Sequence, residues 1–202
     1  MKDFPIPQAA IFDFDGTLFD SMWVWTQLDH DFLRAFGVEP PPDIAREVEA
    51  MTIRQACEHF RRRFGLAESA DRLMERMLDM TAQAYAQQIQ PFGWALEYLP
   101  RLAERGTPAA IVTAGHESHV RSALVRCGLE NHFAAVLTPE NTGLTKAQPE
   151  IFLLAARRMG IAPTDCLVFE DSIHAAQAAW AAGCSVALMG PDGRPHKIER
   201  FS

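Results

Sequence analysis

The chain has 202 residues, of which 48% are hydrophobic and 22% are charged, as in a globular protein with one domain or one domain plus an insertion. Its formal net charge is −7, which argues against a nucleic-acid-binding surface, because such a surface needs a basic patch. No uninterrupted apolar run reaches the roughly 18 residues that a membrane-spanning helix needs, so we expect neither a nucleic-acid partner nor a membrane partner.

The first predicted element is a buried strand, and a long helical segment follows it directly. Residues 9–14 read "AAIFDF", and an apolar run without polar alternation is typical of a strand that is buried on both faces. Residues 19–89 show no strand pattern, and Thr52 and Ser69 are placed to begin helices within them. Apolar residues in this segment recur at helical spacing at Trp25, Leu28, Phe32 and Phe36.

From residue 90 onward, helices and strands alternate along the chain. The apolar runs that predict strands are residues 108–113, 134–138, 166–170 and 184–189. The segments that predict helices each end at a glycine, as many helices do, and are residues 93–105, 116–127, 149–159 and 172–182. This alternation predicts a parallel sheet with helices on both faces, into which residues 19–89 are inserted.

Acidic, hydroxyl and amine side chains lie where the predicted strands end. They are Asp13 and Asp15 at the first strand, Thr113 and Ala114 at the second, Glu170 and Asp171 at the fourth, and Lys146 in the loop before the helix at 149–159. The carboxyl ends of parallel strands meet at one edge of a sheet, where ligands bind. We therefore expect these residues to lie together.

Several carboxylates at one sheet edge cannot all remain ionised without compensation. A hard divalent cation with oxygen ligands resolves the conflict, and Mg²⁺ is the natural choice. A lysine and a hydroxyl beside the acids suit a phosphoryl group, where negative charge accumulates. One carboxylate can then act as a nucleophile and form an aspartyl-phosphate, while its neighbour two residues on protonates the leaving oxygen and activates water.

Four motifs resemble those of the haloacid dehalogenase-like superfamily in order and spacing: "DFDGTLFDS" (13–21), "IVTAG" (111–115), "KAQPEIF" (146–152) and "VFEDS" (168–172). The chain is most similar to the branch that holds β-phosphoglucomutase-like enzymes and phosphatases. The resemblance implies an α/β fold, with a Rossmann-like three-layer core around a parallel sheet and an inserted all-helical cap domain. Residues 1–18 and 90–202 are expected to form the catalytic core, and residues 19–89 the cap.

The resemblance also implies a role for each catalytic residue. Asp13 is expected to be the nucleophile, and Asp15 the general acid/base. Thr113 and the main-chain amide of Ala114 are expected to hold the phosphoryl oxygens. Lys146 is expected to bridge the phosphoryl group and the nucleophile.

The same resemblance implies a Mg²⁺ site formed by four acids. Asp13 is expected to bind the ion through its carboxylate and Asp15 through its main-chain carbonyl. Asp171 is expected to be a ligand, with Glu170 beside it or acting through water. The implied activity is a Mg²⁺-dependent phosphomonoester hydrolase that acts on a small phosphorylated metabolite.

The nearest alternative is a sugar phosphomutase such as β-phosphoglucomutase, which needs a cation in the cap to hold a second phosphate. The matching stretch, "EAMTIRQAC" (49–57), has Ile53 where the family has arginine, and Thr52 in place of a serine. Arg54 is one residue away, which on a helix points about 100° away. This departure favours the hydrolase. Two further departures, Ala147 and Ala175, remove no catalytic group.

Three other classes fit the sequence less well. A dehalogenase needs neither a metal nor an acid at position 15. A signalling receiver domain also combines acids, a hydroxyl and a lysine, but it lacks a helical insert after the first strand. A catalytically idle regulatory protein would have lost the nucleophile, and Asp13 is present.

The cysteines indicate a reducing compartment. None of them forms a C-x-x-C pair, and each lies in an apolar pattern: Cys57, Cys127, Cys166 and Cys184. Buried free thiols suit the cytosol, and the N-terminal stretch "MKDFPIPQAA" lacks the apolar core of a secretory signal. We therefore expect a cytoplasmic protein, and no sequence pattern indicates its oligomeric state.

Overall fold

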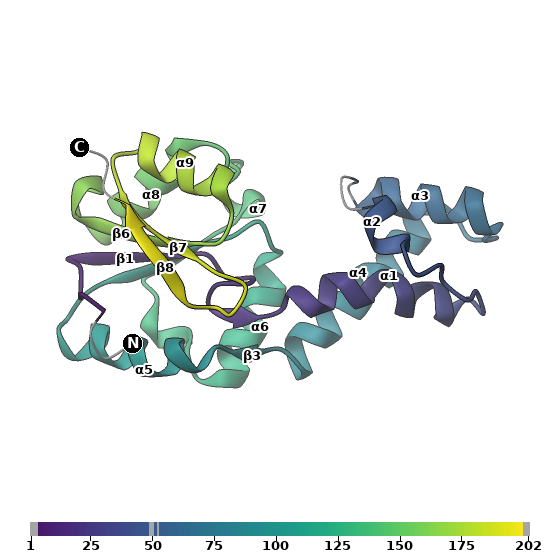
Figure 1. The fold of residues 1–202 in the computed structure, drawn as a ribbon, viewed down its shortest axis with the longest axis horizontal. Helices are drawn as coiled ribbons and strands as arrows, with labels where there is room; N and C mark the ends of the chain where they lie inside the picture. The colour runs from purple at the N-terminus through teal and green to yellow at the C-terminus, as the bar shows by residue number, and fades with distance from the viewer. Residues whose placement is uncertain (1–3, 49–50, 52, 200–202) are drawn as a thin grey trace. The chain divides into compact units, whose positions relative to one another are not determined.

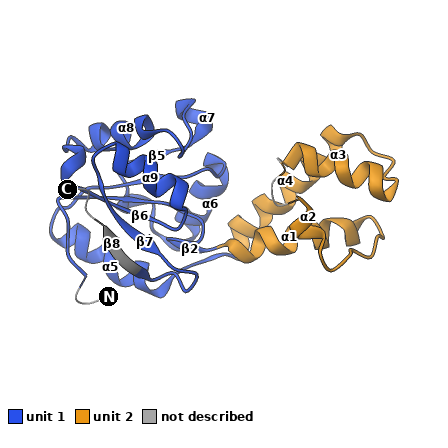
Figure 2. Cartoon of the chain, turned by 45° about the horizontal axis from the view of Figure 1, so that its top comes forward, with its two compact units in different colours: residues 1–20, 89–202 blue, residues 21–88 orange. Residues whose placement is uncertain are grey.

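The computed structural model describes residues 4–48, 51 and 53–199 (Figure 1). The chain forms two compact units (Figure 2). Unit 1 comprises Met1–Asp20 and Ile89–Ser202, and unit 2 comprises Ser21–Gln88. Each unit has a hydrophobic core of its own.

In the described residues, unit 1 is built on a six-stranded sheet with the order β5-β4-β1-β6-β7-β8. In chain order the strands are β1 (Ala9–Phe12), β4 (Ala109–Val112), β5 (Ala135–Leu137), β6 (Cys166–Glu170), β7 (Ser185–Met189) and β8 (Pro195–Glu199). The first five pair in parallel, and β8 pairs antiparallel with β7. The predicted α/β fold with a parallel sheet is confirmed.

Strand β1 lies at the centre of the sheet, between β4 and β6. Its Ile11 pairs with Ala110 on one side and with Val168 on the other. The chain runs from β1 to β4 and β5 on one side, and then to β6 and β7 on the other. Ligands bind at such a switch in strand order in open parallel sheets. The residues that follow β1 are therefore placed where a ligand site is expected.

Alternate residues of the central strands pack on helices of opposite layers. Ile11 and Val168 belong to a core that includes residues of α8 (Pro149–Met159) and α9 (Ile173–Ala181). Phe12 and Phe169 pack on aromatic residues of α5 (Gly93–Glu104). Figure 1 shows α8 and α9 on one side of the sheet, and α5 and α6 (Glu117–Cys127) on the other. Burial on both faces explains why these strands lack polar alternation.

Short elements complete unit 1. The helix α7 (Pro139–Thr142) follows β5, and 3₁₀ turns form at Glu130–His132 and Pro163–Asp165. A two-stranded ribbon pairs β2 (Phe19–Asp20) antiparallel with β3 (Gln90–Pro91). This ribbon corrects the prediction that no strand lies in residues 19–89.

The ribbon and β8 were both missed by the sequence patterns, for different reasons. Two-residue strands are too short to show a period, and β2 pairs with residues about seventy positions away along the chain. Strand β8 reads "PHKIE", and proline and charged residues are typical of an edge strand rather than of a buried one.

Unit 2 is helical in its described residues. Its helices are α1 (Met22–Ala35), α2 (Ile44–Val48), α3 (Ile53–Phe64) and α4 (Ala70–Gln87). Phe32 of α1, Phe60 of α3 and Leu73 of α4 are fully buried in its core. The predicted cap of α4 is confirmed, because the Ser69 hydroxyl accepts a hydrogen bond from the Arg72 amide at 3.4 Å. The predicted cap at Thr52 lies outside the described residues.

The described helices include none that is both long enough and apolar enough to cross a membrane.

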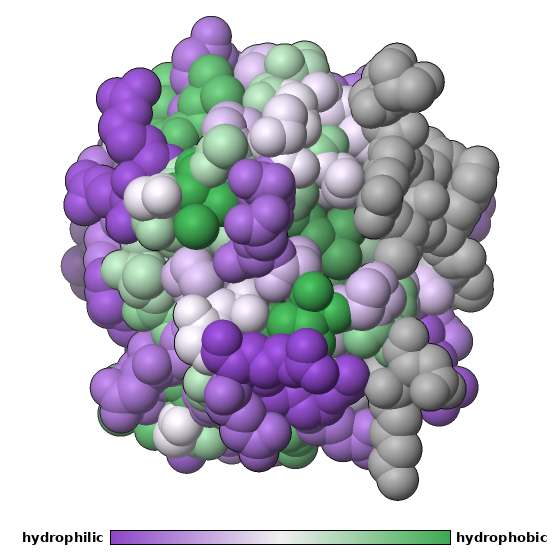
Figure 3. All heavy atoms as spheres, turned by 90° about the vertical axis from the view of Figure 1, so that its left-hand side faces the viewer, coloured by the Kyte–Doolittle hydropathy of each residue, from purple (hydrophilic) through white to green (hydrophobic). Residues whose placement is uncertain are grey.

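On the face drawn in Figure 3, hydrophilic and hydrophobic residues are interspersed. Such a mixture is ordinary, because the surface of a folded protein always keeps a large share of apolar atoms.

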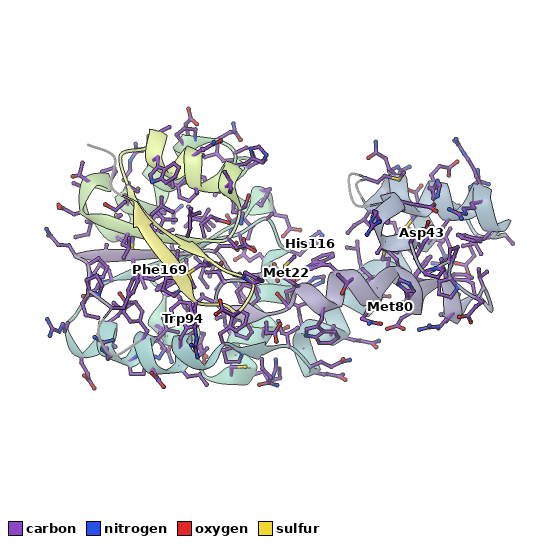
Figure 4. All side chains as sticks on the ribbon, viewed as in Figure 1. Met22, Asp43, Met80, Trp94, His116 and Phe169 are labelled. Carbon is purple, nitrogen blue, oxygen red and sulfur yellow. The ribbon has the colours of Figure 1, made fainter. Side chains whose placement is uncertain are left out.

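Phe169 lies at the centre of an aromatic cluster and is fully buried. Its ring stacks on Phe12, with the centroids 4.6 Å apart. It also stacks on Trp94, with the centroids 5.6 Å apart; Figure 4 labels Phe169 and Trp94. Replacing Phe169 with Ala should lower the free energy of unfolding by about 3–5 kcal/mol, because the packed layers close only partly around the cavity. Urea unfolding followed by circular dichroism measures this change.

The matched control is Leu96→Ala on α5, whose side chain is 49% exposed. We expect this control to change the free energy of unfolding by less than about 0.5 kcal/mol. If Phe169→Ala cost no more than the control, the aromatic cluster would not be part of the stabilising core.

Candidate active site

Asp13 is buried at the carboxyl end of β1 and is only 2% exposed. Its main-chain N–H donates to the Phe169 carbonyl at 2.9 Å, which fixes the backbone against β6. The chain then turns back, because the amides of Leu18 and Phe19 both donate to the Phe14 carbonyl. Gly16 supports this turn with a φ of 74°, a left-handed conformation that glycine adopts without steric cost.

Lys146 joins two buried carboxylates. Its Nζ donates to Asp13 Oδ1 at 2.6 Å, and to the two oxygens of Glu170 at 3.1 and 3.2 Å. The side chains of Asp13 and Glu170 are 2% and 0% exposed, and that of Lys146 is 16% exposed. Charged groups this deeply buried need such pairing, because each would be costly alone.

The charges of this site do not balance. Burial raises the pKa of the Asp13 carboxyl to about 6; Lys146 opposes this rise, and Asp15 and Asp171 add to it. Burial and then the charge of Asp13 raise the pKa of Glu170 well above its ordinary value, against the effect of Lys146. Burial alone would lower the pKa of Lys146, but Asp13 and Glu170 raise it. One protonated lysine therefore faces more negative charge than it can neutralise.

A third acid extends this cluster. Carboxylate oxygens of Asp13, Glu170 and Asp171 all lie within 4.8 Å of one another. The main-chain N–H of Ser172 donates to Glu170 Oε1 at 3.0 Å, and its hydroxyl caps α9. Oxygen ligands at this spacing, with surplus negative charge, fit a hard divalent cation such as Mg²⁺.

On the β4 side of Asp13, the site has a hydroxyl and a further carboxylate instead of the lysine. Thr113 is buried, and its hydroxyl accepts a hydrogen bond from the Gly115 amide at 3.0 Å. A Cβ atom at Gly115 would lie 3.3 Å from Thr113 Oγ1 and 3.4 Å from Asp15 Oδ2. The Asp15 carboxylate and the Thr113 hydroxyl therefore border the same space. Ala114, between Thr113 and Gly115, is exposed.

The structure brings the residues named from the sequence to one edge of the sheet, in two groups. Lys146, Glu170 and Asp171 lie on the β6 side of Asp13, and Asp15 and Thr113 adjoin Gly115 on the β4 side. The sequence patterns included Gly115 in the motif "IVTAG" but assigned it no role in the site. A glycine directly after the strand-end Thr-Ala pair was the available signal, because glycine often marks a place where a side chain would obstruct a ligand.

Replacing Lys146 with Ala leaves Asp13 and Glu170 buried without their cation. We expect the free energy of unfolding at neutral pH, in the presence of a chelator, to fall by about 3–5 kcal/mol, the usual cost of breaking a buried ion pair. The deficit should shrink as the pH falls, beginning above pH 6, because the loss of Lys146 raises the pKa of Asp13 beyond about 6 and protonation of the carboxyls removes the uncompensated charge. Urea unfolding over a pH series measures both effects.

The control for this substitution is Arg121→Ala, whose side chain is 57% exposed in its ion pair with Glu117. Exposed pairs contribute about 0–1 kcal/mol, so the control should change stability little at any pH. Equal losses for the two variants would contradict the stabilising role of Lys146.

Two curated relatives of the chain are named as phosphatases. A fructose-1-phosphate phosphatase of Escherichia coli (strain K12) is 30% identical over 183 residues, which cover 87% of this chain and 92% of the relative. Hexitol phosphatase A of the same strain is 30% identical over 194 residues, which cover 95% of this chain and 88% of the relative. Both matches span most of each protein, so they include the residues of unit 1 and unit 2 together.

Solved structures share the fold. A candidate β-phosphoglucomutase from Thermotoga maritima has a TM-score of 0.82 at 21% identity, over 96% of this chain and 88% of that one. CbbY from Rhodobacter sphaeroides, solved with phosphate, has a TM-score of 0.74 at 19% identity, over 95% and 89%. The family model of the haloacid dehalogenase-like hydrolases matches residues 10–189. The resemblance and the enzyme class predicted from the motifs are thus confirmed, and the chain belongs to the haloacid dehalogenase-like hydrolase family.

Proposed function

We propose that the protein is a Mg²⁺-dependent phosphatase that hydrolyses a small phosphorylated carbohydrate through an aspartyl-phosphate. The observation that carries this proposal is the buried Asp13 carboxylate, held at 2.6 Å from the Lys146 amine beside two further carboxylates. The named activities of the relatives, a fructose-1-phosphate phosphatase and a hexitol phosphatase, support the substrate class. The four cysteines are free thiols, which suits a reaction in the reducing cytosol.

Asp13 is the nucleophile in this proposal. One of its carboxylate oxygens attacks phosphorus, the bond from phosphorus to the ester oxygen breaks, and an aspartyl-phosphate forms. Asp15 gives its proton to the leaving oxygen, so that the carbohydrate departs as an alcohol. Asp15 then takes a proton from water, which attacks phosphorus, releases inorganic phosphate and restores the Asp13 carboxylate.

The phosphoryl oxygens are held from both sides of Asp13. Lys146 supplies positive charge from the β6 side. On the β4 side the Thr113 hydroxyl accepts from the Gly115 amide, which leaves its own proton for a phosphoryl oxygen. Ala114 is an exposed residue, and its main-chain N–H is the proposed further donor. Donors placed where charge develops in the transition state lower the barrier of phosphoryl transfer.

The acidic cluster is the proposed Mg²⁺ site. Asp13 and Asp171 would hold the ion by their carboxylates and Asp15 by its main-chain carbonyl, with Glu170 beside them directly or through water. When bound, the ion neutralises negative charge on the phosphoryl group. Both oxygens of Glu170 already accept hydrogen bonds from Lys146, so Glu170 also positions this lysine.

Contacts inside unit 2 favour the hydrolase over a phosphomutase, which must hold a second phosphate with a cation. Ile53 begins α3 at the position where the family has arginine. The neighbouring Arg54 forms an ion pair with Asp71. The basic run at Arg61–Arg63 is likewise engaged by Glu58 and Glu47. Thr52, considered as a substitute for the family's serine, lies outside the described residues.

The activity itself is tested with a panel of phosphorylated sugars and sugar alcohols, scored for inorganic phosphate. We expect phosphate release with Mg²⁺, its loss in excess chelator, and its recovery when Mg²⁺ is restored, because the carboxylate cluster needs a cation. Full activity in excess chelator would contradict the metal assignment.

A product ratio separates the hydrolase from the mutase. The protein is given β-glucose 1-phosphate and a bisphosphate primer, and we expect phosphate release to dominate. Isomerisation about tenfold faster than phosphate release, a barrier difference of about 1.4 kcal/mol, would favour the mutase.

The division of labour between the two aspartates is tested by substitution. Asp13→Asn should abolish turnover and the phosphoenzyme, because an amide is not a nucleophile at phosphorus. Asp15→Asn should slow turnover by about 10²–10⁴-fold, the usual contribution of a general acid/base. Single-turnover assays with ³²P-labelled substrate, quenched in acid, measure both steps.

The matched control is Asp165→Asn, in the 3₁₀ turn that precedes β6 at the opposite edge of the sheet. It should leave turnover unchanged. Near-normal turnover of Asp13→Asn would require another nucleophile.

A further inference from the structure

Two cysteines lie side by side at the beginning of neighbouring strands. Cys166 begins β6, and Cys184 comes directly before β7. These strands are neighbours in the sheet (Figure 1), and their parallel register places Leu167 opposite Ser185. One residue earlier, the same register places Cys166 beside Cys184. Neighbouring strands lie about 4.8 Å apart, which is within the Cα separation of about 4.4–6.8 Å that a disulfide requires.

The two thiols also meet on one face of the sheet. Both residues belong to the core that includes residues of α8 and α9, and each is 1% exposed. The Cys184 thiol forms a hydrogen bond with the Cys166 sulfur, and the Cys166 thiol donates to the Ala162 carbonyl at 3.5 Å. The two sulfur atoms are therefore within hydrogen-bond distance of each other, although both residues are free thiols.

This hydrogen bond makes the two thiols unequal. It lowers the pKa of the Cys166 thiol, against the opposing effects of burial and of the Asp165 charge. The same hydrogen bond, followed by burial, raises the pKa of the Cys184 thiol. Because the thiolate is the nucleophile toward oxidants, Cys166 is the sulfur that reacts first, and Cys184 is the sulfur that completes a disulfide.

A pocket of about 460 Å³ has both cysteines in its lining. Its other lining residues come from the segment before β1, from the turns that precede β6 and β7, and from the first residues of these strands. Gln8 and Asp165 give it a polar side, where the Gln8 amide donates to Asp165 Oδ1 at 3.1 Å. The pocket lies at the opposite edge of the sheet from Glu170, which ends β6. A small polar oxidant thus has a place beside the two sulfur atoms.

We propose that Cys166 and Cys184 are a modification site, at which a small peroxide converts the two thiols into an intramolecular disulfide. The Cys166 thiolate attacks a peroxide oxygen, the O–O bond breaks, and hydroxide leaves, so that Cys166 becomes a sulfenic acid. The Cys184 sulfur then attacks the Cys166 sulfur, the S–S bond forms, and the S–O bond breaks. With hydrogen peroxide, the two thiols give up two hydrogen atoms, and the peroxide is reduced to two molecules of water.

A disulfide of this kind is compatible with a reducing compartment. Cytosolic disulfides are usually transient and often sense oxidants, and a small thiol reverses them by exchange. The inference does not rest on the proposed phosphatase activity, because the pair lies at the other edge of the sheet and its tests involve no phosphorylated substrate.

Mass spectrometry on the full chain tests the proposal. The reduced protein is treated with hydrogen peroxide in native buffer, its remaining thiols are alkylated in denaturant, and it is digested with trypsin. One fragment, residues 159–197, contains both cysteines, because its only internal arginine, Arg194, precedes a proline. We expect this fragment to escape alkylation and to be lighter by two hydrogen atoms, while Cys57 and Cys127 are alkylated. Dithiothreitol should restore all four thiols.

Substitutions assign the two sulfur atoms. Cys184→Ala should leave Cys166 as a sulfenic acid, which dimedone traps. Cys166→Ala should leave Cys184 as a thiol, which is alkylated. The control Cys127→Ala, at a half-buried position of α6, should leave the disulfide unchanged.

The thermal midpoint shows whether the folded sheet accommodates the disulfide. The oxidised protein should unfold about 4 °C or more above the reduced protein, because the disulfide closes the chain between β6 and β7. Retention of both thiols in excess peroxide, a disulfide that includes Cys57 or Cys127, or a lower midpoint of the oxidised protein would each overturn the proposal. These three results come from the unaltered chain, so they do not depend on the folding of any variant.

Discussion

The contact of Lys146 with Asp13 and Glu170 is the interaction on which the candidate site depends. Both carboxylates are almost completely buried, and neither could remain charged there without a cation close by. The contact exists because β6 pairs with β1, and because the loop before α8 brings Lys146 to the carboxyl ends of these two strands. The same pairing that forms the sheet therefore also keeps the carboxylate of Asp13 available for chemistry.

The central place of β1 gives Asp13 two different sets of neighbours. On the β6 side it meets carboxylates and an amine, which suit a divalent cation and a phosphoryl group. On the β4 side, the Thr113 hydroxyl and the Asp15 carboxylate adjoin Gly115, which suits proton transfer and oxygen binding. Two aspartates that are two residues apart can thus serve different steps, because the turn after β1 directs them to different surroundings.

Asp13 and Asp29 are buried aspartates whose pKa values are both raised to about 6, but the negative charges of the two carboxylates have different neighbours. Asp13 has the amine of Lys146, whereas Asp29 faces a largely apolar pocket. Local rules of protein stability are usually violated where a protein has a function.

The sequence by itself determined the order of the main strands and helices and the residues of the candidate site, because apolar runs, glycine ends and motif spacing are local patterns. Asp13, Lys146 and Glu170 were identified in this way. Only the tertiary structure decided that Lys146 contacts both acids, that β2 pairs with β3, and that Gly115 adjoins the Thr113 hydroxyl and the Asp15 carboxylate. The burial of Asp29 on α1 was likewise decided only by the tertiary structure, because it depends on residues of other helices that are distant along the chain.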